Sequence, residues 1–224
     1  MLNSGECLSD IFNISNKEIF TGDRCHIRNQ FKIGFGCDID YTSCYDYDVF
    51  AFLLGENGKV ISFDHVLFYN SELRVLPHDL TQIHHVKNLS ANLVSAPVDP
   101  ELSVIGHFED NTGAVPFEHK PDDEVWQIDL NRIHPEVVRI IFCISINGGL
   151  NSHQYFGDAR LFVRFLYPEQ NGLETEYLYE PKGDYRPYRA IEVCSIDKVA
   201  DSWEIVPLGV GHENIKELIE RYVG

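Results

Sequence analysis

The sequence has few basic residues and no long apolar run, and each shortage excludes a class of function. It has 18 lysines and arginines against 35 aspartates and glutamates, which leaves a formal net charge of −17. Nucleic acids and anionic membranes would repel this charge, so we expect neither as a partner. No stretch approaches the roughly 18 apolar residues of a transmembrane helix, so we expect no membrane insertion. The first residues also lack the basic and apolar regions of a secretion signal.

Motifs of paired cysteines and of common catalytic sites are missing too. The six cysteines form no CxxC pair and show no regular spacing, and Cys143 and Cys194 lie inside apolar runs, where they are expected to be small core residues. This usage indicates a reducing, cytoplasmic compartment. HExxH and GxSxG are absent, and the glycines at 34–36 and 148–149 lack the context of a phosphate-binding loop, so we predict turns there. These absences favour a protein that is not an enzyme.

The apolar residues of the chain fall into many short runs. Hydrophobic residues make up 44% of the sequence and aromatic residues 12%, enough for a sizeable core. Turn signals such as Asn57-Gly58 separate the runs. The predicted strands are 48–54, 59–63, 65–69, 126–130, 139–146, 159–166, 188–196 and 203–208. We therefore predict an all-β fold, a β-sandwich of two antiparallel sheets with short peripheral helices.

The order of these patterns predicts one main domain with additions. Residues 1–30 read as an N-terminal extension or edge strand, and residues 31–211 as the sandwich domain. Within it, residues 71–105 contain prolines and irregular apolar spacing, which predicts an inserted loop with a helical turn. Residues 212–224 place four apolar side chains on one face, which predicts a C-terminal helix packed on the domain or a docking helix for a partner.

Two acidic clusters stand where predicted core strands begin. Asp38, Asp40, Asp46 and Asp48 precede the apolar run 49–54, and Asp110, Glu118, Asp122, Asp123 and Glu124 precede the run 125–130. Crowded carboxylates repel one another and resist burial unless a cation neutralises them. Calcium does so well, because it takes about six to eight oxygen ligands, mostly from carboxylates and carbonyls. The clusters therefore predict metal binding.

The spacing within the clusters adds detail to this prediction. Asp46 and Asp48, two residues apart on an extended chain, point to the same side. Glu124 begins the face that Trp126 continues towards the core, and an inward carboxylate needs a partner. An EF-hand is excluded, because Ser43 and Val49 stand where that loop needs glycine and glutamate. A metal-dependent hydrolase that uses the same carboxylates stays open from the residues alone.

The ordered segments resemble the TerD-like family of tellurium-resistance and stress-response proteins. The resemblance lies in residues 34–38, 45–54, 64–70, 110–113, 118–124, 128–130, 156–160 and 203–209, and covers roughly residues 31–211. It implies a β-sandwich that binds Ca²⁺ through its acidic loops and has no established enzymatic chemistry. The ligands that it implies are Asp38, Asp46, Asp48, Asp110, Glu118, Asp122, Asp123 and Glu124.

The chain departs from the family pattern at several positions. Cys37 replaces a tryptophan, and 119–121 (His-Lys-Pro) replace a glycine-rich acidic loop. Lys120 brings a positive charge near the expected ion, which predicts a weakened or lost site. The alternative function is therefore a metal-free protein–protein interaction module of the same fold, which recognises partners through 71–105 or the C-terminal helix.

Overall fold

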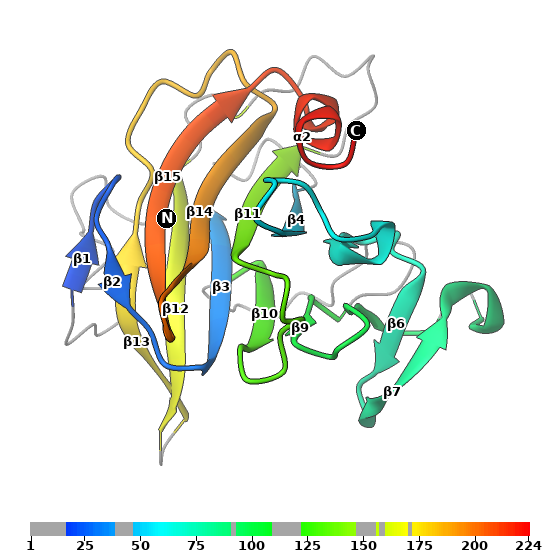
Figure 1. Cartoon of the computed structure of the whole chain (residues 1–224). Helices are drawn as coiled ribbons and strands as arrows, with labels where there is room; N and C mark the ends of the chain where they lie inside the picture. Colours follow the sequence, from blue (N-terminus) through cyan, green and yellow to red (C-terminus); the bar gives the residue numbers. More distant parts are fainter. Residues whose placement is uncertain are drawn as a thin grey trace.

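The computed structural model describes residues 17–38, 47–90, 93–108, 122–146, 156, 160–169 and 172–224, and the structural statements below concern these residues. Two six-stranded sheets pack face to face (Figure 1). The first sheet has the order β1 (Lys17–Ile19), β13 (Gly172–Tyr179), β12 (Arg160–Glu169), β3 (Gln30–Asp38), β10 (Glu124–Asp129), β9 (Val104–Ile105). The second has the order β2 (Cys25–His26), β15 (Ser202–His212), β14 (Ala190–Val199), β11 (Arg139–Ile146), β4 (Tyr47–Leu54), β5 (Val66–Leu67).

The predicted β-sandwich is confirmed, since inward side chains of both sheets form one core. The rings of Phe35 in β3 and Phe142 in β11 lie 5.6 Å apart between their centroids. Trp126 in β10 meets Phe142 edge-on at 5.7 Å. The paired strands are antiparallel except β1, which pairs with β13 in parallel. Cys143 and Cys194 are fully buried, and burial raises the pKa of both thiols, as expected for core cysteines.

The second sheet is buried on its outer face as well. In β4, Val49, Ala51 and Leu53 face the sandwich core. The residues between them, including Phe50 and Phe52, pack instead against the C-terminal helix α2 (Ile215–Tyr222). The whole β4 run is apolar for this reason, whereas a strand with one wet face alternates. The predicted C-terminal helix is therefore present and packs on the domain.

The glycines of β3 correct one prediction. Gly34 and Gly36 lie inside the strand rather than in a turn, and they face outward because Ile33 and Phe35 face the core. A Cβ on Gly34 would come within 2.4 Å of the Asp122 carboxyl carbon, and one on Gly36 within 2.0 Å of the Phe162 ring. Each glycine, by lacking a Cβ, leaves a notch in the strand that a neighbouring side chain fills. The predicted strand 59–63 is also wrong: Val60 makes only an isolated bridge to Leu54, and the 3₁₀ turn η1 (Phe63–His65) follows.

The insertion 71–105 is more regular than its sequence predicts. It forms a third sheet beside the sandwich, with the order β7 (Asp79–His85), β6 (Leu73–Leu76), β8 (Ala96–Pro97) (Figure 1). The expected helical turn is the 3₁₀ segment η2 (Val86–Asn88). The buried guanidinium of Arg74 holds the sheet to its surroundings by donating to Ser95 Oγ, Ser95 O and Tyr69 O. The sequence did not reveal these strands because their apolar residues pack on one another over short, irregular spans.

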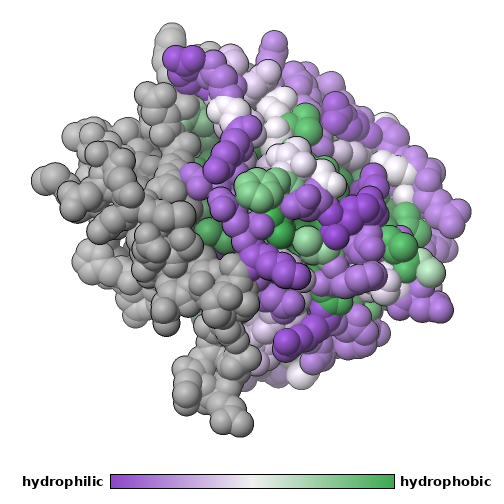
Figure 2. All heavy atoms as spheres, turned by 90° about the vertical axis from the view of Figure 1, so that its left-hand side faces the viewer, coloured by the Kyte–Doolittle hydropathy of each residue, from purple (hydrophilic) through white to green (hydrophobic). Residues whose placement is uncertain are grey.

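The surface agrees with the acidic composition of the chain. Figure 2 shows that the face that carries the β1 and β13 edge is mainly hydrophilic, with apolar residues scattered among polar ones. In the part of the chain that the structure describes, no helix is long and apolar enough to cross a membrane.

A buried carboxylate fastens α2 to the second sheet. Glu192 in β14 accepts hydrogen bonds from Arg221 Nη1 and Tyr222 Oη, both at 3.0 Å, and His212 Nε2 lies 3.1 Å from the same oxygen. Burial by itself would raise the pKa of the Glu192 carboxyl. The contacts with His212 and Tyr222 and the charge of Arg221 outweigh burial, so this pKa is lowered. The ionised carboxylate is thus the form that holds the helix.

The packing of α2 predicts different costs for two adjacent truncations. Leu218 is fully buried, whereas Ile219 is 37% exposed. Leu218→Ala should lower the free energy of unfolding by about 2–5 kcal/mol, because it leaves a cavity under the helix. Ile219→Ala, the matched control, should change it by about 0.5 kcal/mol or less. Urea unfolding of both variants measures the difference, and equal effects would contradict the packing described here.

The Glu192 contacts predict an acid-sensitive part of the stability. The pKa of the Glu192 carboxyl is lower in the folded chain than in the unfolded chain. Its contribution to the free energy of unfolding is therefore complete above the unfolded-state pKa and is lost as pH falls through the folded-state pKa. Glu192→Gln should cost about 1–3 kcal/mol at neutral pH and reduce the loss of stability on acidification to about pH 3. Thermal unfolding across this range tests it, with the exposed Glu220→Gln as control. An unchanged acid profile in Glu192→Gln would count against this role.

Candidate metal centre

The described members of the two acidic clusters, Asp48 and Asp122 to Glu124, lie at one end of the sandwich. Strand β10 begins at Glu124, which lies opposite Phe35, three residues before the end of β3 at Asp38. The backbone N–H of Val49, at the start of β4, donates to Glu124 Oε1 at 3.0 Å across a sequence separation of 75 residues. This bond joins the starts of β4 and β10, one from each sheet. The strand starts that follow the two acidic clusters are therefore adjacent in the fold.

Glu124 points into the sandwich, as its spacing predicts. Its Oε2 accepts a hydrogen bond from Trp126 Nε1 at 2.8 Å, while Oε1 accepts the Val49 amide. Neutral donors thus satisfy both oxygens of an inward carboxylate that would otherwise be costly to bury. Glu124 positions the strands around it.

Asp122 lies on the opposite, outer face of the first sheet and is paired with an arginine. Arg164 in β12 donates from Nε to Asp122 Oδ1 at 2.8 Å and from Nη2 to Oδ2 at 2.5 Å. A third nitrogen, Nη1, donates to Thr175 Oγ1 at 3.2 Å. The carboxylate occupies the notch left by Gly34. This fork-to-fork pair neutralises Asp122 with a protein cation.

Arg164 is the site residue that the sequence analysis missed. Its signal was present: in β12 the arginines alternate with core residues such as Val163 and Phe165, so Arg164 must face outward. An outward arginine that is nearly buried needs an acidic partner. The sequence does not reveal that the partner is Asp122, because β12 and the start of β10 meet only through β3.

Asp48 and Asp123 also lie close to the junction of β4 with β10. Asp48 is 8% exposed and shares the outer face of the second sheet with Phe50, two residues along β4. Asp123 is exposed, and its backbone N–H donates to Phe35 O at 2.8 Å. Asp123 and Glu124 also line a cavity of about 10 Å³ with Tyr47 and Val49. Such a cavity has about the size of one water molecule.

The other predicted ligands are less fully described. The backbone of Asp38 ends β3 opposite Arg160, but its side chain lies outside the described atoms. Asp46, Asp110 and Glu118 lie outside the described residues, as does Lys120. Among the side chains that are described, no three of the types His, Cys, Asp and Glu form a group that holds a metal ion. The described carboxylates face three directions: the core, the outer face of the first sheet and the outer face of the second.

Comparison with known proteins identifies the family of this chain. The chain matches the TerD domain family over residues 22–222. It is similar to a solved homologue of the telluride resistance protein (TerD) from Streptomyces coelicolor A3(2), with 14% identity, coverage of 88% of this chain and 99% of that chain, and a TM-score of 0.46. It is also similar to the solved protein of unknown function SAV2460, with 14% identity, coverage of 84% and 92%, and a TM-score of 0.43. Because the family match spans most of its length, the chain belongs to the TerD domain family.

Proposed function

We propose that this protein is a non-enzymatic, cytoplasmic calcium-binding member of the tellurium-resistance and stress-response type. Membership of the TerD domain family supports a function of the tellurium-resistance type. The observation that carries the calcium proposal is the Val49–Glu124 hydrogen bond, which joins the strand starts that follow the two acidic clusters. In a chain with a net charge of −17, this end concentrates carboxylates that a hard cation neutralises.

The donor set has the chemistry that calcium prefers, and its members have different roles. Asp48 and Asp123 are the described candidates for direct ligation. The remaining candidate ligands are Asp38, Asp46, Asp110 and Glu118. Asp122 and Glu124 already hold Arg164 and the strand ends, so we assign them to support the site.

The proposed mechanism is binding without a chemical step. A bound ion neutralises carboxylates from two distant parts of the chain and links the segments that carry them. Because the ligands meet only in the folded chain, calcium stabilises that state by mass action. A linked end of the sandwich then offers an ordered surface to a protein partner.

The Arg164–Asp122 pair favours the alternative function, a metal-free interaction module. In this pair a protein cation has already taken the place that a metal would fill beside one predicted ligand. If other predicted ligands are neutralised in the same way, partner recognition is the function that is left. Calcium titration separates the two functions.

The calcium proposal predicts a rise in melting temperature on adding calcium, reversed by a chelator and larger than with magnesium. Asp48→Asn should weaken calcium affinity about tenfold, since it removes a charged ligand. Asp201→Asn, at an exposed turn between β14 and β15, is the matched control and should have no effect. Calorimetry measures these affinities. Absence of calcium binding by the wild-type protein would leave the interaction module as the function.

The role of Asp122 predicts a loss of stability without a loss of affinity. Asp122→Asn leaves the nearly buried Arg164 guanidinium without its charge partner, which should cost about 3–5 kcal/mol. The double variant Asp122→Leu with Arg164→Met removes both charges and should recover much of that stability. Calcium affinity of the double variant should equal that of the wild type. A drop as large as that of Asp48→Asn would instead make Asp122 a ligand.

A further inference from the structure

A cavity of about 310 Å³ lies on the outer face of the first sheet, where the insertion meets it. Gln30 and Lys32 of β3 and Gln127 of β10 form its floor, and Leu80 and Leu102 of the insertion form a wall. The cavity lies towards the ends of β3 and β10 that are remote from the metal centre, as the register of Gln30 with Asp129 shows. Its volume is at the small end of the range of about 300–1,000 Å³ typical of ligand sites.

The apolar wall is held in an unusual backbone conformation. Leu102 has φ of +58°, in the left-handed region that large side chains rarely adopt. The buried carboxylate of Asp99 maintains this turn by accepting hydrogen bonds from Ser103 N at 2.8 Å and Val104 N at 2.7 Å. The resulting wall presents Leu80, Leu102 and Ile105 to one side of the cavity. Strained backbone of this kind persists where the surroundings hold it in place, often at binding sites.

The polar side of the cavity carries three charged groups, the cations Lys32 and Arg132 and the carboxylate Asp129. Lys32 and Arg132 both line it, and neither forms an ion pair with any of the residues that the structure describes. The Asp129 carboxylate accepts hydrogen bonds from the neutral donors Gln30 Nε2 at 2.9 Å and Asn131 N at 3.1 Å, so its single negative charge offsets one of the two cations.

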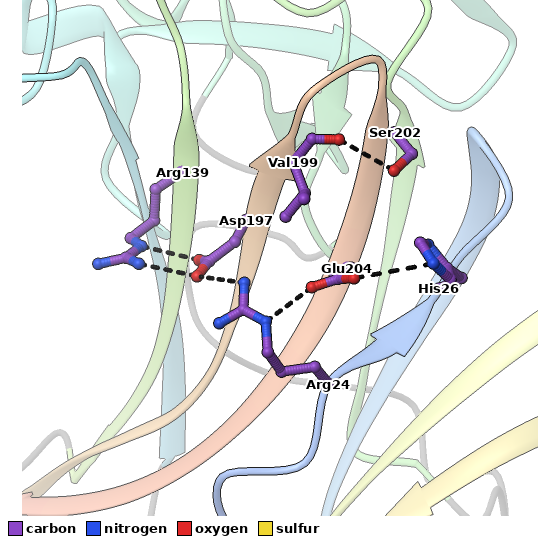
Figure 3. Close-up of polar contacts among 7 residues, drawn as sticks. All are labelled: Arg24, His26, Arg139, Asp197, Val199, Ser202 and Glu204. Carbon is purple, nitrogen blue, oxygen red and sulfur yellow. Dashed lines mark hydrogen bonds and ion pairs between the residues drawn. The ribbon is translucent and has the colours of Figure 1, made fainter.

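Several arginines elsewhere in this acidic chain pair with carboxylates. Arg139 donates to both oxygens of Asp197 at 2.7 Å, and Arg24 donates to Glu204 at 2.7 Å (Figure 3). Lys32 and Arg132 differ from these arginines, because both line one cavity and neither has an ion-pair partner among the described residues. With Asp129 counted, the cavity lining keeps one net positive charge, which favours an anionic ligand.

We propose that this cavity binds a small organic anion with an apolar body and one carboxylate. The apolar body lies against Leu80, Leu102 and Ile105, and the carboxylate pairs with Lys32 and Arg132. A charge-assisted pair with a guanidinium is among the strongest hydrogen-bonded contacts that a cavity offers a carboxylate. The insertion 71–105 thereby gains a function: it supplies the apolar wall that the sandwich alone lacks. This inference is independent of calcium binding.

Three ligands of equal chain length test the proposed chemistry. The wild-type protein is titrated with octanoate, octanol and octylammonium, and binding is followed by amide shifts in NMR spectra with a chelator present. Octanoate should bind saturably and shift the amides of β3, β10 and the insertion, whereas octanol should bind more weakly and octylammonium weakest. No saturable binding of octanoate, or equal binding of octylammonium, would overturn the proposal. Because the chelator removes calcium, a failure of the calcium proposal leaves this result unaffected.

Variants locate the site. Arg132→Gln and Lys32→Gln should each weaken octanoate binding by about tenfold. Lys87→Gln is the matched control, because Lys87 is an exposed lysine of η2 that does not line the cavity. Leu102→Asn removes the apolar contact while asparagine tolerates the left-handed backbone, so affinity should fall and the melting temperature should hold. Octanoate affinity unchanged in all three cavity variants would overturn the assignment.

Discussion

Burial of strand β4 on both faces is the constraint on which the rest of the architecture depends. The first sheet covers its inner face, and α2 covers its outer face. From Val49 to Leu54 the strand is therefore apolar, and its polar residue Asp48 lies at the start. The same constraint explains Glu192: a carboxylate under the helix is stable because Arg221, Tyr222 and His212 surround it. Polar chemistry is thus moved to the ends and edges of the sandwich.

At the acidic end, each described carboxylate has a different physical setting. Glu124 is inside and bound by neutral donors, whereas Asp122 is outside and bound by a guanidinium. Protein donors satisfy both carboxylates without a metal, and these contacts hold the strand ends in place. Asp48 and Asp123 lie at these held ends, and in the proposed function rigid neighbours of this kind position them as ligands. The contacts of Glu124 and Asp122 thus fix the strand ends that carry the candidate ligands.

The insertion shows how an addition to a sandwich acquires its own chemistry. Its third sheet has a small apolar cluster, and its last strand, β9, joins the first sheet as an edge. Joining the edge brings Leu80 and Leu102 beside outward-facing side chains of β3 and β10, including Lys32. An apolar wall and unpaired cations then share one cavity. Such a combination selects for ligands that are apolar at one end and anionic at the other.

Local pattern determined much of this protein: the two-residue period of β12, the apolar run of β4, the one-sided spacing of α2 and the acidic residues at strand starts all follow from sequence. These features depend on which face a side chain takes, and local periodicity encodes that. Tertiary structure alone decided what covers each face. Gly34 and Gly36 read as a turn until Asp122 and Phe162 are seen to occupy the space beside them. Arg164, Asp122 and the cavity of the insertion likewise depend on contacts between distant segments, which no local spacing specifies.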